Sequence, residues 1–157
     1  MSWDTVRPQI AVILADVEGP GGLDGVIHQY QRLSVQSDKF LEHFAVTESP
    51  GKKRINGGII TRSKLEEPVS SSSHNELMHG VIIRWYYGVN DAEATELLFQ
   101  AFIERICAAF RAKYQINGTC SDSTPVQAPI IEPRMFSSVL CHFCELTFTV
   151  TEWNAWS

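Results

Sequence analysis

The sequence predicts an α+β protein in which a mostly antiparallel, twisted sheet carries helices packed on one face. A strand near the middle of the chain turns directly into a long amphipathic helix. A second long strand near the C-terminus has one face that is apolar except for a single histidine, and shorter elements lie between polar turns. The 157 residues suffice for a substantial core. We therefore expect a single domain over residues 1–157, with a long polar arm at about 65–76.

The segment from His79 to Tyr114 is expected to form the centre of the core. Alternate residues of the strand from Val81 to Tyr87 share one face, and Gly88 ends the strand. Asn90 occupies the N-cap position that a helix would need. The apolar stripe of that helix comprises Phe99, Phe102, Ile103, Ile106 and Phe110.

The N-terminal half predicts shorter elements. Pro8 fits the first turn of a helix that ends at Gly19-Pro20. A short strand is expected over Val26–Tyr30, and a helix over Ser34–Ala45. The next elements are a turn at Pro50-Gly51 and a strand over Arg54–Lys64 with a bulge at Gly57-Gly58. The serine-rich segment over Leu65–Glu76 is expected to be a long hairpin arm or a mobile loop.

The C-terminal strand contains a Cys-x-x-Cys sequence, Cys141 to Cys144. Residues three apart on a strand point to opposite faces, so these thiols are not expected to share a zinc or redox site. The inward face, from Leu140 to Val150, is apolar except for His142, which we interpret as a hydrogen-bonded core histidine. The threonine-rich opposite face is expected to contact either solvent or a partner. An edge strand is expected over Val126–Glu132, because prolines flank it.

Composition narrows the possible functions. The formal net charge of -5 does not predict tight binding to a nucleic-acid backbone. No apolar run approaches the length of a membrane span, and the first residues do not have the pattern of a secretory signal. Four cysteines in a chain of this length do not indicate a disulfide framework, so synthesis in a reducing cytoplasm is expected.

Catalytic motifs are not recognisable, and no catalytic, cofactor or metal residues are predicted. The Gly-rich stretch from Gly19 to Gly25 follows a helix and lacks the phosphate-binding fingerprint. An alternative function is an enzyme or small-ligand binder with a pocket near His142, Cys144 and Tyr87.

Three blocks together resemble the tail-terminator and tail-completion proteins of long-tailed bacteriophages. They are RINGGIITR (54–62), HGVIIRWYYGVNDAEATELLFQAFIERICAAFR (79–111) and EPRMFSSVLCHFCELTFTVTE (132–152). The resemblance implies a structural neck protein of the virion, made in the bacterial host cytoplasm. Such a protein forms a ring, usually six-fold, at the head-proximal end of the tail tube. It stops tail growth there and joins the tail to the head connector.

The expected partners are therefore other copies of this chain, the tail tube protein and the connector or other neck proteins. DNA would pass through the ring without specific binding, and no membrane is involved. We predict that the basic run at Lys52–Arg54 contacts an acidic cluster of a neighbouring subunit. The full set of predicted oligomer or partner contacts is Lys52, Lys53, Arg54, Arg62, Lys64, Glu67, Ser71, His74, Asp91, Glu93, Glu96, Trp153 and Trp156.

Overall fold

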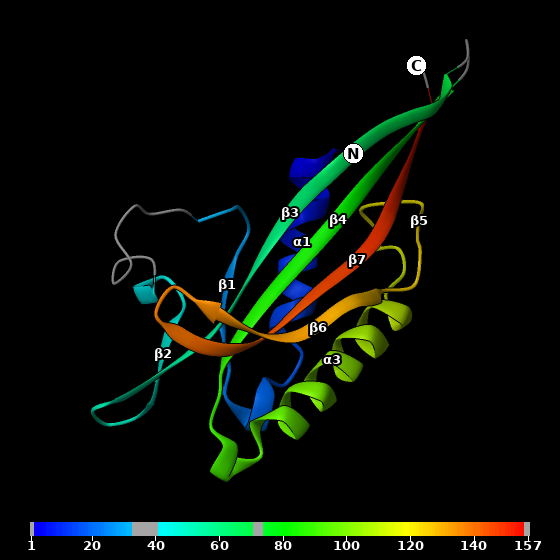
Figure 1. The fold of residues 1–157 in the computed structure, drawn as a ribbon. Coiled ribbons are helices and arrows are strands. Elements are labelled where there is room, and N and C mark those ends of the chain that lie inside the picture. The colour runs from blue at the N-terminus through cyan, green and yellow to red at the C-terminus, as the bar shows by residue number, and fades with distance from the viewer. Residues whose placement is uncertain (1, 33–40, 71–73, 156–157) are drawn as a thin grey trace.

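A computed structural model describes residues 2–32, 41–70 and 74–155, and it confirms the α+β class (Figure 1). In chain order the elements are α1 (Trp3–Ala15), the 3-10 helix η1 (Pro20–Gly22), β1 (Val26–His28), β2 (Ala45–Ser49), β3 (Lys52–Ser70), β4 (His74–Gly88), the 3-10 helix η2 (Asp91–Glu93), α3 (Thr95–Ala112), β5 (Asp122–Ser123), β6 (Gln127–Phe136) and β7 (Val139–Ala155).

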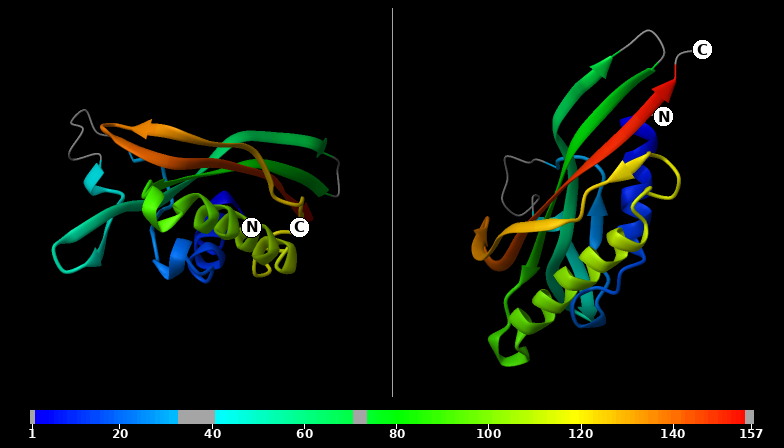
Figure 2. Two further views of the ribbon diagram at one scale, coloured as in Figure 1. Left: turned by 60° about the horizontal axis from the view of Figure 1, so that its bottom comes forward. Right: turned by 90° about the vertical axis from the view of Figure 1, so that its right-hand side faces the viewer.

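The strands form one curled sheet that is mostly antiparallel, as predicted. The main strand order is β1-β3-β4-β7-β5, while β2 pairs with β3 and β6 pairs with β7. β1 pairs with β3 in parallel, and the other pairings are antiparallel. Figure 2 shows α1 and α3 side by side on one face of this sheet, which confirms the predicted layering.

The main core lies between the sheet and the two helices. The whole predicted stripe of α3 is buried there, against Trp85 and Tyr87 of β4 and Leu146 of β7. Trp3, Val6 and Ile10 of α1 complete this cluster from the N-terminus. A smaller apolar cluster covers part of the opposite sheet face; its buried members are Phe44, Ile55, Ile59, Phe136 and Cys141.

The predicted bulge at Gly57-Gly58 is wrong, because both glycines stay in regular register with β4. Gly58 pairs with Trp85, and a Cβ built on Gly58 would lie 2.3 Å from the Trp85 ring. The indole N–H donates a hydrogen bond of 2.9 Å to Asn56 Oδ1. The glycine therefore makes room for a large ring that is fixed by a hydrogen bond and by the core.

The two main helices begin elsewhere than the sequence indicated. α1 starts at Trp3, so Pro8 lies inside the helix rather than in its first turn, and the helix ends before Gly19. The lost backbone hydrogen bond is tolerated because the apolar stripe of α1 packs into the core. α3 starts at Thr95 instead of after Asn90, since η2 and a left-handed Ala94 with a φ of 53° intervene.

Other boundaries also differ from the predictions. The helix predicted over 34–45 falls mostly on residues 33–40, which lie outside the described residues, and Ala45 begins β2. The edge strand predicted over Val126–Glu132 is β6, which continues to Phe136. It continues because β7 is long enough to pair with it as far as the turn before Val139. The turn at Pro50-Gly51 is confirmed between β2 and β3.

The sheet extends past the helix layer as an arm. This arm comprises residues 62–70 of β3, 74–80 of β4 and 150–155 of β7; β4 and β7 stay in regular register, while the pairing of β3 with β4 has irregularities between Arg62 and Lys64 and between Glu66 and Val69. Figure 1 shows these strands running to the upper right beyond α1, where the end of β7 lies beside β3 and β4. The polar segment predicted as a hairpin arm or a mobile loop is thus a hairpin arm, with β7 as a third strand.

Candidate interaction sites: a charged cleft and the sheet arm

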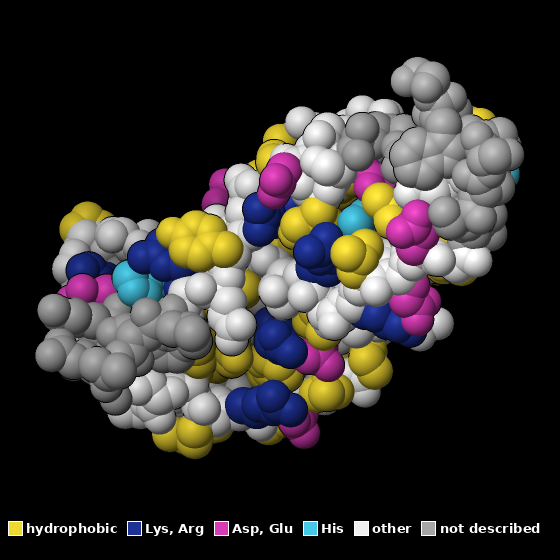
Figure 3. Space-filling model, turned by 90° about the horizontal axis from the view of Figure 1, so that it is seen from above, with side chains coloured by type: hydrophobic (Ala, Val, Ile, Leu, Met, Phe, Trp, Pro, Cys, Tyr) yellow, Lys and Arg dark blue, Asp and Glu magenta, His cyan; other side chains and the backbone are white. Residues whose placement is uncertain are grey.

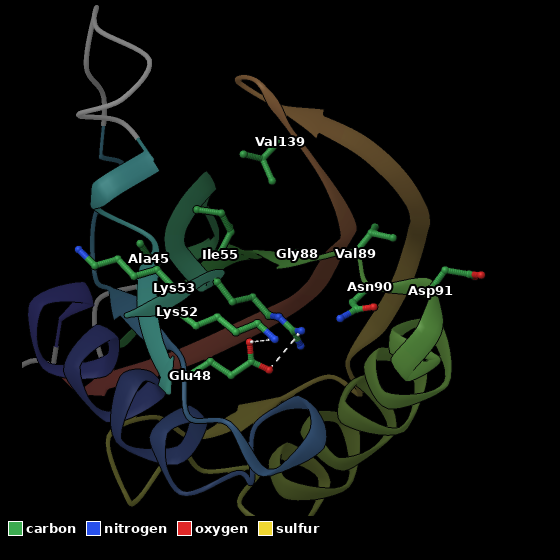
Figure 4. A pocket seen from close by; sticks show the side chains of 11 residues that line it. Ala45, Glu48, Lys52, Lys53, Ile55, Gly88, Val89, Asn90, Asp91 and Val139 are labelled. Carbon is green, nitrogen blue, oxygen red and sulfur yellow. Dashed lines mark ion pairs between the residues drawn. The ribbon is translucent and has the colours of Figure 1, made fainter. Parts of the chain in front are cut away.

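A cleft of about 590 Å³ opens between the β2–β3 hairpin and the end of β4 (Figure 4). Its apolar walls include Ile55, Val89 and Val139. Its polar lining comprises Glu48, Lys52, Lys53, Arg54, Asn90 and Asp91. The cleft therefore contains four of the residues predicted from sequence as partner contacts.

Arg54 is the best-anchored charge of the cleft. Its Nη2 lies 2.7 Å from Glu93 Oε2 and 3.2 Å from Glu48 Oε1, and its Nη1 donates a 2.8 Å hydrogen bond to the Tyr87 hydroxyl. Its side chain is only 8% exposed. Burial by itself would lower the pKa of Arg54, but the hydrogen bond to Glu93 and the neighbouring Tyr87 and Glu48 raise it. This pairing ties the β2–β3 hairpin to the segment that leads into α3.

The acidic partner of the basic run is thus in the same chain, where the sequence suggested a neighbouring subunit. Besides Arg54, Lys52 Nζ lies 3.9 Å from Glu93 and 3.5 Å from Glu48. The hydrogen bond from Arg54 lowers the pKa of Glu93. The sequence could not distinguish the two arrangements, since ion-pair partners 39 residues apart are set by tertiary folding.

The other charges at the cleft point outwards. Figure 4 shows Lys53 extending away from the Lys52–Glu48 pair, and Asp91 pointing away from the opposite wall. Both residues are exposed, and neither forms an ion pair within the described part of the chain. Lys53 and Asp91, rather than Lys52 and Arg54, are therefore the cleft charges available to a partner.

The predicted contact residues on the arm form polar pairs within the hairpin or a ring contact across two strands. Lys64 Nζ pairs with Glu66 at 2.6 Å, and Glu67 Oε1 accepts a 3.1 Å hydrogen bond from Asn75. The rings of His74 and Trp153 lie 5.1 Å apart between β4 and β7. Ser71 and Trp156 lie outside the described residues. The arm thus brings together β3, β4 and β7 side chains that the sequence could place only on separate segments.

A buried polar chain crosses the base of the arm. Arg62 Nη1 lies 3.4 Å from His79 Nδ1, and His79 Nε2 lies 2.9 Å from Glu152 Oε2. The Trp3 ring of α1 lies 5.6 Å from the His79 ring. His79 and Glu152 are almost completely buried, and Glu152 Oε1 has no hydrogen-bond partner within residues 2–32, 41–70 and 74–155.

Sequence reasoning identified Arg62 but missed this chain of contacts. A signal was present, because His79 continues the inward alternation of Val81, and Glu152 continues that of Val150. The pattern alone is a weak signal, because charged and polar residues are mostly exposed in folded proteins.

The alternative pocket near His142 is small. His142 Nε2 lies 2.8 Å from Thr95 Oγ1, and its ring stacks near Phe99 and Tyr87. Burial lowers the pKa of His142, and the charge of Glu96 only partly offsets this. The adjacent cavity holds about 80 Å³, whereas ligand pockets usually measure roughly 300–1,000 Å³. The hydrogen bond to Thr95 agrees with a core histidine.

The two thiols of the Cys-x-x-Cys sequence lie on opposite sheet faces, as predicted. Cys144 belongs to the main core and Cys141 to the smaller cluster. Burial raises the pKa of each thiol to about 12. No cluster of three or more His, Cys, Asp or Glu side chains suited to a metal occurs among the described residues.

None of the helices within the described ranges has both the length and the apolar character required to cross a membrane. No protein-family model matches the chain, and a search of curated protein sequences finds no match either.

Proposed function

We propose that this chain is a structural assembly protein that forms a ring at the head-proximal end of a phage tail tube. In that position it stops tail growth and joins the tail to the head connector. It acts through contacts with other copies of itself, with the tail tube protein and with a neck protein, and it catalyses no reaction. The proposal starts from the sequence resemblance described above.

The single observation that carries it further is the arm. The arm strands extend beyond the helices that cover the rest of the sheet, so they add little to the core of the monomer. The arm also exposes two large apolar side chains, Leu65 at 52% and Trp153 at 46%. Leu65 pairs with the inward-facing His79 and Trp153 with Glu76, so they lie on opposite faces of the arm. Exposed apolar residues on a projecting element favour insertion between neighbouring molecules.

The net charge suits a DNA conduit. Each subunit contributes a formal charge of -5, and a ring multiplies that charge around its channel. DNA inside would meet weak repulsion instead of adhesion, which leaves it free to move.

The test is assembly of the wild type and of a Leu65→Lys, Trp153→Lys double variant. Size-exclusion chromatography with light scattering should give a discrete oligomer for the wild type and a folded monomer for the variant. A matched control is Val12→Lys, since Val12 is 46% exposed on α1, away from the arm. The control should assemble normally.

A second measurement addresses the tail. Tail tubes of the phage or prophage that encodes the chain, mixed with wild-type protein, should carry a ring at one end in electron micrographs. A wild type that stays monomeric at every concentration and leaves tail ends bare would refute the proposed function. A ligand-dependent shift in the melting temperature of such a monomer would favour the small-ligand alternative.

A further inference from the structure

A second surface of the molecule is basic, although the chain as a whole is acidic. A hollow of about 600 Å³ lies beside the end of β1, lined by Arg7, Ile27, His28, Gln29, Tyr30 and Arg32. None of these lining residues carries a carboxylate. In the view from above, basic, histidine and hydrophobic side chains lie side by side on the left of the molecule, with an acidic side chain at the edge of the group (Figure 3). The hollow is therefore suited to anionic groups.

Among the described residues, the positive groups in this hollow lack a strong countercharge. Arg32 donates a 3.2 Å hydrogen bond to His43 Nδ1 and lies over the Tyr30 ring, so its described partners are uncharged. Arg7 pairs with Asp4 at 3.0 Å, but Asp4 is 85% exposed, and such pairs are weak. Burial lowers the pKa of His28, and the nearby charge of Arg32 lowers it further.

A complementary acidic surface lies where η2 leads into α3. Asp91 and Glu96 are exposed and form no ion pair within the described residues, unlike Glu93 between them. Leu97 next to them is 67% exposed, and Tyr30 beside the basic hollow is 57% exposed. Each surface thus combines free charge with one large exposed apolar side chain. In Figures 1 and 2, α3 begins at the lower end of the molecule, far from the end of β1.

We propose that the hollow formed by Arg7 and Arg32 receives the Asp91 and Glu96 carboxylates of a second copy of this chain. The inference rests on the ring proposed above and specifies the contact between its subunits. Two different surfaces on one molecule give a head-to-tail contact, which closes into a ring when the rotation between neighbours allows it. Tyr30 and Leu97 would pack beside the charges and exclude water from them.

The experiment is a charge swap between two variants. One carries Arg7→Glu and Arg32→Glu, and the other carries Asp91→Lys and Glu96→Lys. Alone, each variant meets like charge at every contact and should elute as a monomer at low salt, where the wild type is oligomeric. In an equimolar mixture every contact between unlike variants joins opposite charges. The mixture should therefore recover the oligomer, with the two variants alternating.

Controls separate this contact from folding and from the ring itself. Circular dichroism should give wild-type spectra for both variants, and the milder pair Arg7→Gln, Arg32→Gln replaces the reversal if that variant fails to fold. A double change at other exposed charges, Glu104→Lys with Arg111→Glu, should leave assembly unchanged.

The outcomes are distinct. If the wild type forms an oligomer and each variant assembles equally well alone, this contact is wrong while the ring stands. The same conclusion follows if both folded variants are monomers and the mixture does not recover the oligomer. If the wild type itself is a monomer at all concentrations and salt levels, the ring and this contact are both wrong. Loss in each variant and recovery in the mixture would establish the contact.

Discussion

The body of the molecule and its arm share three continuous strands but are stabilised differently. In the body, these strands contact a continuous apolar layer, such as Trp85 against Phe102 with ring centroids 4.9 Å apart. At the base of the arm, the corresponding inward positions hold His79 and Glu152. The pairing of β4 with β7 is thus continuous from the body into the arm, while the side chains buried beneath it change from apolar to polar.

This difference shows how one sheet can serve two purposes. The body obtains its stability mainly from apolar burial, which is roughly 25 cal/mol per Å². The arm has ladder hydrogen bonds, including those of β7 with β5, together with local side-chain contacts such as His74 against Trp153. Beneath it lie only a short polar chain and the contact of His79 with Trp3 of α1 among the described residues. The arm therefore depends on the body to define its register, and its exposed apolar side chains remain available to other molecules.

The largest expected effect tests the body. Phe102→Ala should lower the free energy of unfolding by about 3 to 5 kcal/mol, because it removes a fully buried ring beneath Trp85. Denaturant melts followed by circular dichroism measure this loss. Leu65→Ala in the arm is the matched comparison and should cost less than about 1 kcal/mol in the isolated chain. Equal losses for the two variants would contradict the distinction between body and arm.

The polar base of the arm should respond differently to single and double changes. Glu152→Ala removes the partner of buried His79 and should cost about 1 to 3 kcal/mol. Replacing both residues with leucine should cost less than the sum of the single changes, because no buried polar group is then left unpaired. A double-mutant cycle measures the coupling. Strict additivity would mean that His79 and Glu152 do not stabilise each other.

Two glycines, one in the body and one in the arm, allow the packing of the two regions to be compared. Gly58→Ala should destabilise the protein by about 1 to 3 kcal/mol, since the new methyl would collide with the pinned Trp85 ring. Gly80→Ala in the arm would meet Lys64 Cβ and Ser63 Oγ at 3.0 Å. Ser63 Oγ can rotate away, and Lys64 Cβ would have to move only slightly, whereas the Trp85 ring is held by a hydrogen bond and by the core. Its cost should be smaller. Thermal melts of both variants check the order, and the reverse order would refute this account of Gly58.

Mild acid should produce a smaller, gradual effect in the body. Burial lowers the pKa of both His28 and His142 from the ordinary value of 6.5. The unfolded chain then binds more protons than the native chain, so stability falls as the pH drops below about 6.5 and through the lowered values. Urea melts across that range measure the slope. A His142→Gln variant should show a shallower slope, and an unchanged slope would exclude His142 as a contributor.

Much of the fold could be predicted because local patterns were strong. The buried stripe of α3 and the alternation of β7 agree with their sequence periodicities. Element boundaries were predicted less well. Asn90 resembled a helix cap, but α3 begins only at Thr95, and the Asn90 backbone N–H donates a 3.0 Å hydrogen bond to Thr95 Oγ1. The candidate sites were harder to predict because they join distant segments. The basic run was recognisable, but its partner Glu93 could equally have belonged to another subunit.

The sequence by itself determined which residues face inward along each helix and strand, because side-chain direction follows from a local period. It also determined that Cys141 and Cys144 point to opposite sheet faces. Only the tertiary structure decided that Arg54 pairs with Glu93 of its own chain, and that Gly58 accommodates the Trp85 ring. The tertiary structure also brought His79 next to Glu152, 73 residues later in the chain, at the base of the arm. The physical reason is that such contacts depend on strand order and register, which pairing across the whole sheet sets.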